Sequence, residues 1–143
     1  MKLLHAIETA RAAGDPDRFV EAIPYFRFLG LKLRETPQGL LCILPGDTKL
    51  IGNPLLPALH GGVVGALLEA AGISQLVWQS GLQTVPKTIT ITVDYLRSAR
   101  PVETFAQGIV TRQGRRVANV RVEAWQEDRS KPVAAAHAHF LLQ

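Results

Sequence analysis

The chain has 143 residues, of which 47% are hydrophobic and 20% are charged, and its formal net charge is +4. This length suits one domain and excludes a full (β/α)8 barrel, which needs ~250 residues, and the composition excludes intrinsic disorder. The single cysteine, Cys42, excludes an internal disulfide and a cysteine-based zinc cluster, and it suits a reducing, cytoplasmic compartment. Neither a secretory signal nor a membrane span is expected, because no long stretch is both apolar and free of charge.

The first third of the chain is predicted to form short helices and then two strands. Apolar residues at spacings of three and four predict a helix over residues 3–13, and a second short helix ends at Pro24. Residues 1–25 are therefore expected to form an N-terminal helical extension. Residues 28–35 and 39–44 are predicted strands joined by a turn, and residues 45–57 are predicted to be a loop.

A helix is predicted over residues 60–80, with Gly81 as its terminator. Between Ile51 and Pro86 the only Asp, Glu, Lys or Arg is Glu69. A surface helix normally has one apolar stripe and one charged face. A helix that is apolar on nearly all sides must therefore be buried by a sheet that wraps it, or by a second subunit.

Four strands are predicted after this helix, over residues 88–96, 104–112, 115–126 and 132–142. Apolar and polar side chains alternate in the first of them, which predicts that they face opposite sides of a sheet. The two sets are Ile89, Ile91, Val93 and Tyr95, and Thr88, Thr90, Thr92 and Asp94. The order of elements predicts one α+β domain over residues 1–143, in which an antiparallel sheet cradles one long helix.

Glu69 is the first candidate for chemistry. A carboxylate in a buried helix is costly unless it is paired, hydrogen-bonded or protonated, and no Lys or Arg lies at helical spacing from it. Three glycines share its face, and their missing side chains leave room for a ligand or for close strand packing. The face consists of Gly62, Gly65, Ala66, Gly72 and Ile73. The alternative is that Glu69 emerges at an exposed rim and the glycines serve helix–sheet packing.

The helix opens with His60-Gly61-Gly62, a second candidate for chemistry. Free N–H groups and the positive end of the helix dipole lie at this point, and glycines let an oxygen approach the backbone closely. The Gly61 N–H is therefore predicted to stabilise negative charge that develops on a carbonyl oxygen. The ring of His60 is interpreted as a capping or core group.

Residues 59–69, Leu-His-Gly-Gly-Val-Val-Gly-Ala-Leu-Leu-Glu, resemble the signature of the hotdog-fold acyl-CoA thioesterases. The resemblance is closest to the branch that contains the phenylacetate-pathway and 4-hydroxybenzoyl-CoA thioesterases, in which an acidic residue follows the His by nine positions. It covers roughly residues 26–142, includes the segment Ser98-Ala99-Arg100-Pro101, and implies the hotdog fold.

The resemblance also implies site residues and a mechanism without a cofactor or a metal. The Gly61 N–H would polarise the thioester carbonyl, and Glu69 would attack it directly or activate a water. Asn53 stands one position away from the place of the family's water-positioning Asn, and Thr88 matches a hydroxyl residue at the start of the strand after the helix. Gly61, Glu69, Asn53 and His60 are therefore the expected catalytic residues, and Thr88 is expected to contact the substrate, with Gly62, Gly65 and Ile73.

The implied assembly is a homodimer with the active site between subunits, and a dimer of dimers is left open. The strand over 88–96 would then pair across a two-fold axis, which removes an exposed strand edge. The clustered basic residues favour an anionic partner, here the phosphates of coenzyme A, although a solvated basic surface is the alternative. The candidates are Arg97, Arg100, Arg112, Arg115 and Arg116.

Three other functions stay open at this point: a non-catalytic acyl-CoA-binding module, an enoyl-thioester hydratase or dehydratase, and a nucleic-acid-binding protein. The last is disfavoured because the basic segment lacks interleaved aromatic residues, so neither nucleic acid nor a membrane is expected as a partner. His137 and His139 share one face of the last strand and are interpreted as strand histidines, not metal ligands. The acyl group, and its carrier (coenzyme A or a carrier protein), are not predicted.

Overall fold

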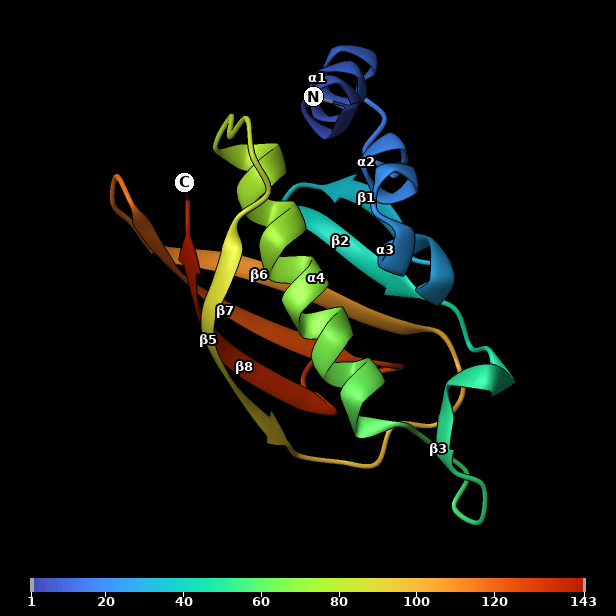
Figure 1. Ribbon diagram of the computed structural model, residues 1–143. Coiled ribbons are helices and arrows are strands. Elements are labelled where there is room, and N and C mark those ends of the chain that lie inside the picture. The colour runs from blue at the N-terminus through green and yellow to red at the C-terminus, as the bar shows by residue number, and fades with distance from the viewer. Residues whose placement is uncertain (1, 143) are drawn as a thin grey trace.

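The structure, a computed structural model, describes residues 2–142. Three short helices come first, followed by two strands, a small hairpin, one long helix and four more strands (Figure 1). The helices are α1 (Lys2–Ala13), α2 (Asp17–Ala22), α3 (Pro24–Leu29), the 3-10 turn η1 (Thr48–Leu50) and α4 (Gly61–Gln79). The strands are β1 (Lys32–Thr36), β2 (Gly39–Leu44), β3 (Ile51–Asn53), β4 (Ala58–Leu59), β5 (Lys87–Tyr95), β6 (Thr104–Gln113), β7 (Val117–Trp125) and β8 (Ala134–Leu141).

Six strands form one antiparallel sheet in the order β1-β2-β6-β7-β8-β5. The sheet curves around α4, which lies along its concave face (Figure 1). Gly72 lets the helix approach the sheet, because a Cβ there would lie only 3.1 Å from the Phe140 ring. This helix-in-sheet architecture confirms the predicted α+β class and is the arrangement expected of the hotdog fold.

The N-terminal helical segment is longer than predicted. Pro24 does not end the second helix but begins α3, since proline fits the first turn of a helix, where its missing N–H has no intrahelical partner. Phe28 and Leu29, which were expected to start a strand, complete this helix, and Gly30 ends it in the left-handed conformation at φ 71°. The helical segment thus extends to Leu29, and the first strand starts at Lys32.

Residues 45–57 are not a simple loop. They contain η1 and β3, and β3 pairs with β4 in a small two-stranded sheet. This hairpin leads directly into α4 and projects beyond the six-stranded sheet (Figure 1). Its tip carries Leu55 and Leu56, which are both exposed.

The face assignment predicted for the strand after the helix is wrong at Thr88. A β-bulge between Thr88 and Thr90 shifts the register with β8, so Thr88 pairs with Phe140 while Thr90 pairs with His139. Because the extra residue, Ile89, breaks the alternation, Thr88 lies on the same side of the sheet as Ile91 and points toward α4.

α4 is buried along its C-terminal half, from Ala70 to Val77, but not along its whole length. Its N-terminal half leaves a partly open stripe beside β5, which includes Gly62, Ala66 and Glu69. The helix is long and apolar enough to cross a membrane by composition, but the sheet wraps it as a core helix. Within one chain, the predicted burial of this helix on nearly all sides therefore holds for its C-terminal half but not for its N-terminal half.

α1 is tied to the far end of α4 by Arg11. Its guanidinium donates to the carbonyl oxygens of Val77 and Leu82, the second at 2.8 Å. The last carbonyls of a helix lack intrahelical partners, and a cation there interacts favourably with the helix dipole. Arg11 therefore stabilises the C-terminal end of α4, the end that lies away from Gly61.

Candidate active site

The first turn of α4 is capped by His60. Its Nδ1 accepts a hydrogen bond from the Gly62 N–H at 2.9 Å, and its backbone carbonyl accepts from the N–H groups of Val63 and Val64. A Cβ at position 62 would lie 2.9 Å from Nδ1, so a larger residue there would require the His60 ring to move. This contact confirms the interpretation of the His60 ring as a cap.

The Gly61 N–H lies at the N-terminal end of this capped turn. Within residues 2–142 it donates no hydrogen bond, in contrast to the N–H groups of Gly62, Val63 and Val64. The Gly61 side of the turn is exposed, so an oxygen can reach the amide. A free N–H at the positive end of a 19-residue helix is a suitable donor to a developing oxyanion.

Glu69 is the last residue of the open stripe, about one turn beyond Ala66. It is half-buried, not fully buried as expected. Its Oε2 accepts a hydrogen bond from the Thr88 hydroxyl at 2.9 Å, and no ion pair of Glu69 occurs among the described residues. The bulge in β5 makes this contact possible by turning Thr88 toward the helix. A carboxylate with one hydrogen bond and partial access to solvent keeps lone pairs available for a water or a substrate.

Tyr95 also reaches α4 from β5, and sequence reasoning did not single it out. Its hydroxyl donates to the Gly61 carbonyl oxygen at 2.8 Å. The ring lies 3.6 Å from where a Cβ of Gly61 would be, and the hydroxyl lies 3.4 Å from the corresponding point at Gly65. Tyr95 therefore occupies part of the space beside Gly61 and Gly65. Gly72, which the sequence places on the same face as Gly65, instead packs against Phe140.

A pocket of about 380 Å³ opens at this end of the helix. It is bounded by β4, the first turn of α4 and the segment that follows β5. Its lining includes Leu59, Gly61, Val64, Tyr95, Arg97 and Ser98. Glu69 is not part of this lining, because it lies eight residues farther along α4, about 12 Å at 1.5 Å per residue.

The other expected contributors lie in different places. Asn53 is exposed on β3, and its Oδ1 accepts from the Leu55 N–H at 3.0 Å, so its amide stabilises the tip of the hairpin. Ile73 is a buried member of the core one turn beyond Glu69. His137 and His139 lie on the outer face of β8, and no group of three metal-ligating side chains forms within the described residues.

The structure separates the arginines that are clustered in the sequence. Arg97 lines the pocket at the start of α4, and its Nη1 donates to the Pro132 carbonyl at 2.7 Å. Arg112 and Arg115 belong to the β6–β7 hairpin, which lies at the opposite end of α4 (Figure 1). The hydrogen bond of 2.8 Å from the Ser80 hydroxyl to Gln113 connects this hairpin to the end of the helix.

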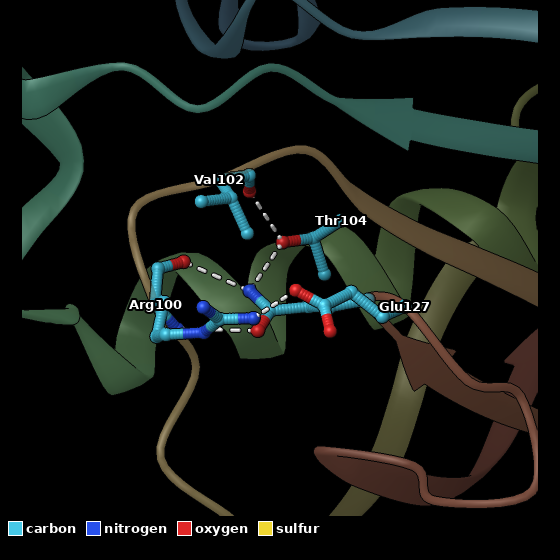
Figure 2. Close-up of polar contacts among 5 residues, drawn as sticks. Arg100, Val102, Thr104 and Glu127 are labelled. Carbon is cyan, nitrogen blue, oxygen red and sulfur yellow. Dashed lines mark hydrogen bonds and ion pairs between the residues drawn. The ribbon is translucent and has the colours of Figure 1, made fainter.

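Arg100 is engaged in contacts within the chain. Its guanidinium forms an ion pair with Glu127, and its carbonyl accepts from the Gln126 side chain at 2.8 Å. Figure 2 shows this network, in which the Thr104 hydroxyl donates to the Val102 carbonyl at 2.9 Å. The network holds the segment between β5 and β6 against the end of β7.

Comparisons with known proteins agree with this fold. The family model of the thioesterase superfamily matches residues 56–133, more than half of the chain. The medium/long-chain acyl-CoA thioesterase YigI of Salmonella typhimurium is 29% identical over an alignment that covers 88% of this chain and 90% of YigI. A protein of known structure from Chromobacterium violaceum is 42% identical, with a TM-score of 0.77 and 96% of each chain covered. A solved member of the thioesterase superfamily is 29% identical, with a TM-score of 0.81 over 97% of this chain and 99% of its own.

Proposed function

The chain belongs to the thioesterase superfamily, and from this premise we propose that it hydrolyses an acyl-CoA thioester to the free acid and coenzyme A. The observation that carries the proposal is that one helix presents two complementary groups: a free N–H at Gly61 and an accessible carboxylate at Glu69. Similarity to proteins named medium/long-chain acyl-CoA thioesterases supports coenzyme A as the carrier and an aliphatic acyl group.

In the proposed reaction, the Gly61 N–H donates to the thioester carbonyl oxygen and stabilises the negative charge that forms on it. Glu69 takes a proton from a water whose oxygen bonds to the carbonyl carbon, and the C–S bond then breaks. The proton returns to the leaving thiolate, so that the products are a carboxylic acid and a thiol. Direct attack by Glu69, followed by hydrolysis of the resulting anhydride, has the same overall balance. The Thr88 hydroxyl orients the carboxylate in both versions.

We propose that each site combines Gly61 of one subunit with Glu69 of a second. The two groups of one chain lie about 12 Å apart along α4, too far to act on the two ends of one carbonyl bond. β5 is an edge strand, and antiparallel pairing with β5 of a second copy, centred near Ile91, brings Thr88 close to the partner subunit's Tyr95. Since Thr88 contacts Glu69 and Tyr95 contacts Gly61, this pairing forms two equivalent sites.

The proposed contacts to substrate follow from the same arrangement. Arg97, at the rim of the pocket beside Gly61, is the arginine best placed to meet the phosphates of coenzyme A. Arg100 is less suited to this role because it is paired with Glu127, and Arg112 and Arg115 lie near the opposite end of α4. The acyl group is proposed to lie along the open stripe of α4, beside Gly62 and Gly65, and not beside Ile73, which is buried in the core.

The experiment that tests this function is thiol release from a panel of acyl-CoAs of increasing chain length, with aryl-CoAs included. Glu69→Gln serves as the matched variant, because it keeps size and hydrogen-bonding shape but cannot act as a base. We expect turnover to fall by about 100-fold or more in the variant while an uncleavable analogue still binds. Binding without turnover in the wild-type protein would instead indicate a binding module. Water addition to an enoyl-CoA without thiol release would indicate a hydratase.

A further inference from the structure

The backbone around Gly61 is held by hydrogen bonds at three of its four polar groups. Four polar groups belong to the two peptide planes that flank this residue: the His60 carbonyl, the Gly61 N–H, the Gly61 carbonyl and the Gly62 N–H. The His60 carbonyl accepts from Val63 and Val64, and the Gly62 N–H donates to the His60 ring. The Gly61 carbonyl accepts from the Tyr95 hydroxyl. Only the Gly61 N–H is without a partner in residues 2–142.

Among the side chains that make these contacts, only Tyr95 comes from outside the helix and its cap. Within one chain Tyr95 is 57% exposed, so packing in the core of that chain does not explain why a tyrosine stands there. The ring instead lies across the glycine face of the first turn, at 3.6 Å from the Cβ position of Gly61. Two consecutive glycines have the greatest backbone freedom of any pair, and a helix end frays readily unless a contact holds it.

We propose that Tyr95 is a positioning residue for the reaction: its hydrogen bond to the Gly61 carbonyl holds the first turn of α4 so that the free N–H points at the thioester oxygen. The inference rests on the proposed function, because it assumes that the Gly61 N–H stabilises the oxyanion. Tyr95 acts through the backbone and not on the substrate. Oxyanion stabilisation depends on a donor that is already oriented before the reaction, so a mobile first turn reduces kcat more than it reduces binding.

Tyr95→Phe tests the role of the hydroxyl alone, because the ring and its packing on Gly61 and Gly65 are kept. We expect kcat to fall about 3- to 10-fold, the value of one hydrogen bond, while KM changes less than about 2-fold. Tyr25→Phe is the matched control, since Tyr25 is the other tyrosine of the chain and is 50% exposed on α3, stacked on Phe28. An unchanged kcat in Tyr95→Phe overturns the proposal, as does an equal loss in Tyr25→Phe.

A second measurement separates this inference from the proposed function. Amide hydrogen exchange at Gly62, Val63 and Val64, measured by NMR without substrate, reports how firmly the first turn is held. We expect exchange to be several-fold faster in Tyr95→Phe than in the wild-type and Tyr25→Phe proteins. If the wild-type protein hydrolyses no thioester, the proposed function fails, and the exchange rates still decide whether Tyr95 holds the turn. Unchanged exchange overturns the positioning role whatever the activity.

Discussion

The Glu69 carboxylate and the Thr88 hydroxyl lie 2.9 Å apart, joined across the gap between the central helix and the edge strand. The contact depends on the bulge at Ile89, which reverses the face on which Thr88 would otherwise lie. It gives a half-buried carboxylate one fixed partner and leaves the rest of its lone pairs accessible.

Thr88→Val removes the hydroxyl but keeps a β-branched side chain of similar size. We expect kcat to fall about 10-fold, since a hydrogen bond to a charged group contributes about 1.5–3 kcal/mol and this one is partly exposed. Steady-state thiol release measures the effect. Thr90→Val is the control, because Thr90 lies on the outer face of β5 and contacts His139. Equal losses in both variants would contradict a specific role for Thr88.

Mixed dimers test whether Gly61 and Glu69 act across subunits. Gly61→Pro removes the N–H at a helix position where proline is well tolerated, and Glu69→Gln removes the base. Each variant alone is expected to be inactive. Random mixing of the two chains should restore about a quarter of wild-type activity, because half of the dimers are mixed and each of these contains one intact site.

The control for the mixing experiment is refolding or co-expression of each variant with itself, which should restore nothing. Activity is measured at several ratios of the two chains and should be greatest at equal amounts. If mixed samples remain inactive although dimers form, the two residues act within one chain or not at all.

Arg97→Ala is expected to raise KM for an acyl-CoA about 10-fold with little change in kcat, because a charge-assisted contact to phosphate is lost. The same variant should hydrolyse an acyl-pantetheine, which lacks the nucleotide, as well as the wild-type protein does. Arg115→Ala, in the β6–β7 hairpin, is the matched control. A rise in KM in the control alone would place the phosphates at the other end of α4.

Cys42 predicts a loss of stability at alkaline pH. Burial in β2 raises the pKa of its thiol from 9.0 to about 12; a backbone hydrogen bond with Ile43 opposes the shift, and Asp17 adds to it. Above pH 9 the thiol of the unfolded chain loses its proton while the folded thiol keeps it. The free energy of unfolding should therefore fall by up to about 1.4 kcal/mol per pH unit until the folded thiol ionises.

Urea unfolding at pH 8, 9 and 10 measures this slope, and Cys42→Ala provides the comparison. All other pH-dependent contributions to stability are common to the two proteins, so the difference between the two slopes isolates the thiol. Parallel slopes would show that Cys42 is not shielded as its burial implies. The native thiol should also resist alkylation at pH 8, because almost none of it is ionised.

The sequence alone determined the central helix, its two ends and the candidate carboxylate. These features are local: His60 and Gly81 are an N-terminal cap and a left-handed terminator, and they act on residues within one turn of themselves. Glu69 stood out because it is the only charged residue in a long apolar stretch. The resemblance of residues 59–69 to the thioesterase signature depended on the same short segment.

Only the tertiary structure decided which distant residues meet this helix. A one-residue bulge turned Thr88 toward Glu69, and alternation along a strand cannot reveal such a bulge in advance. Tyr95 reaches Gly61 from 34 residues away, and Arg11 reaches Val77 from 66 residues away. The arginines that are neighbours in sequence lie at opposite ends of α4, because β6 carries the chain from one end of the sheet to the other. Local patterns specify elements, whereas contacts between elements depend on register and strand order, and packing across the whole chain determines both.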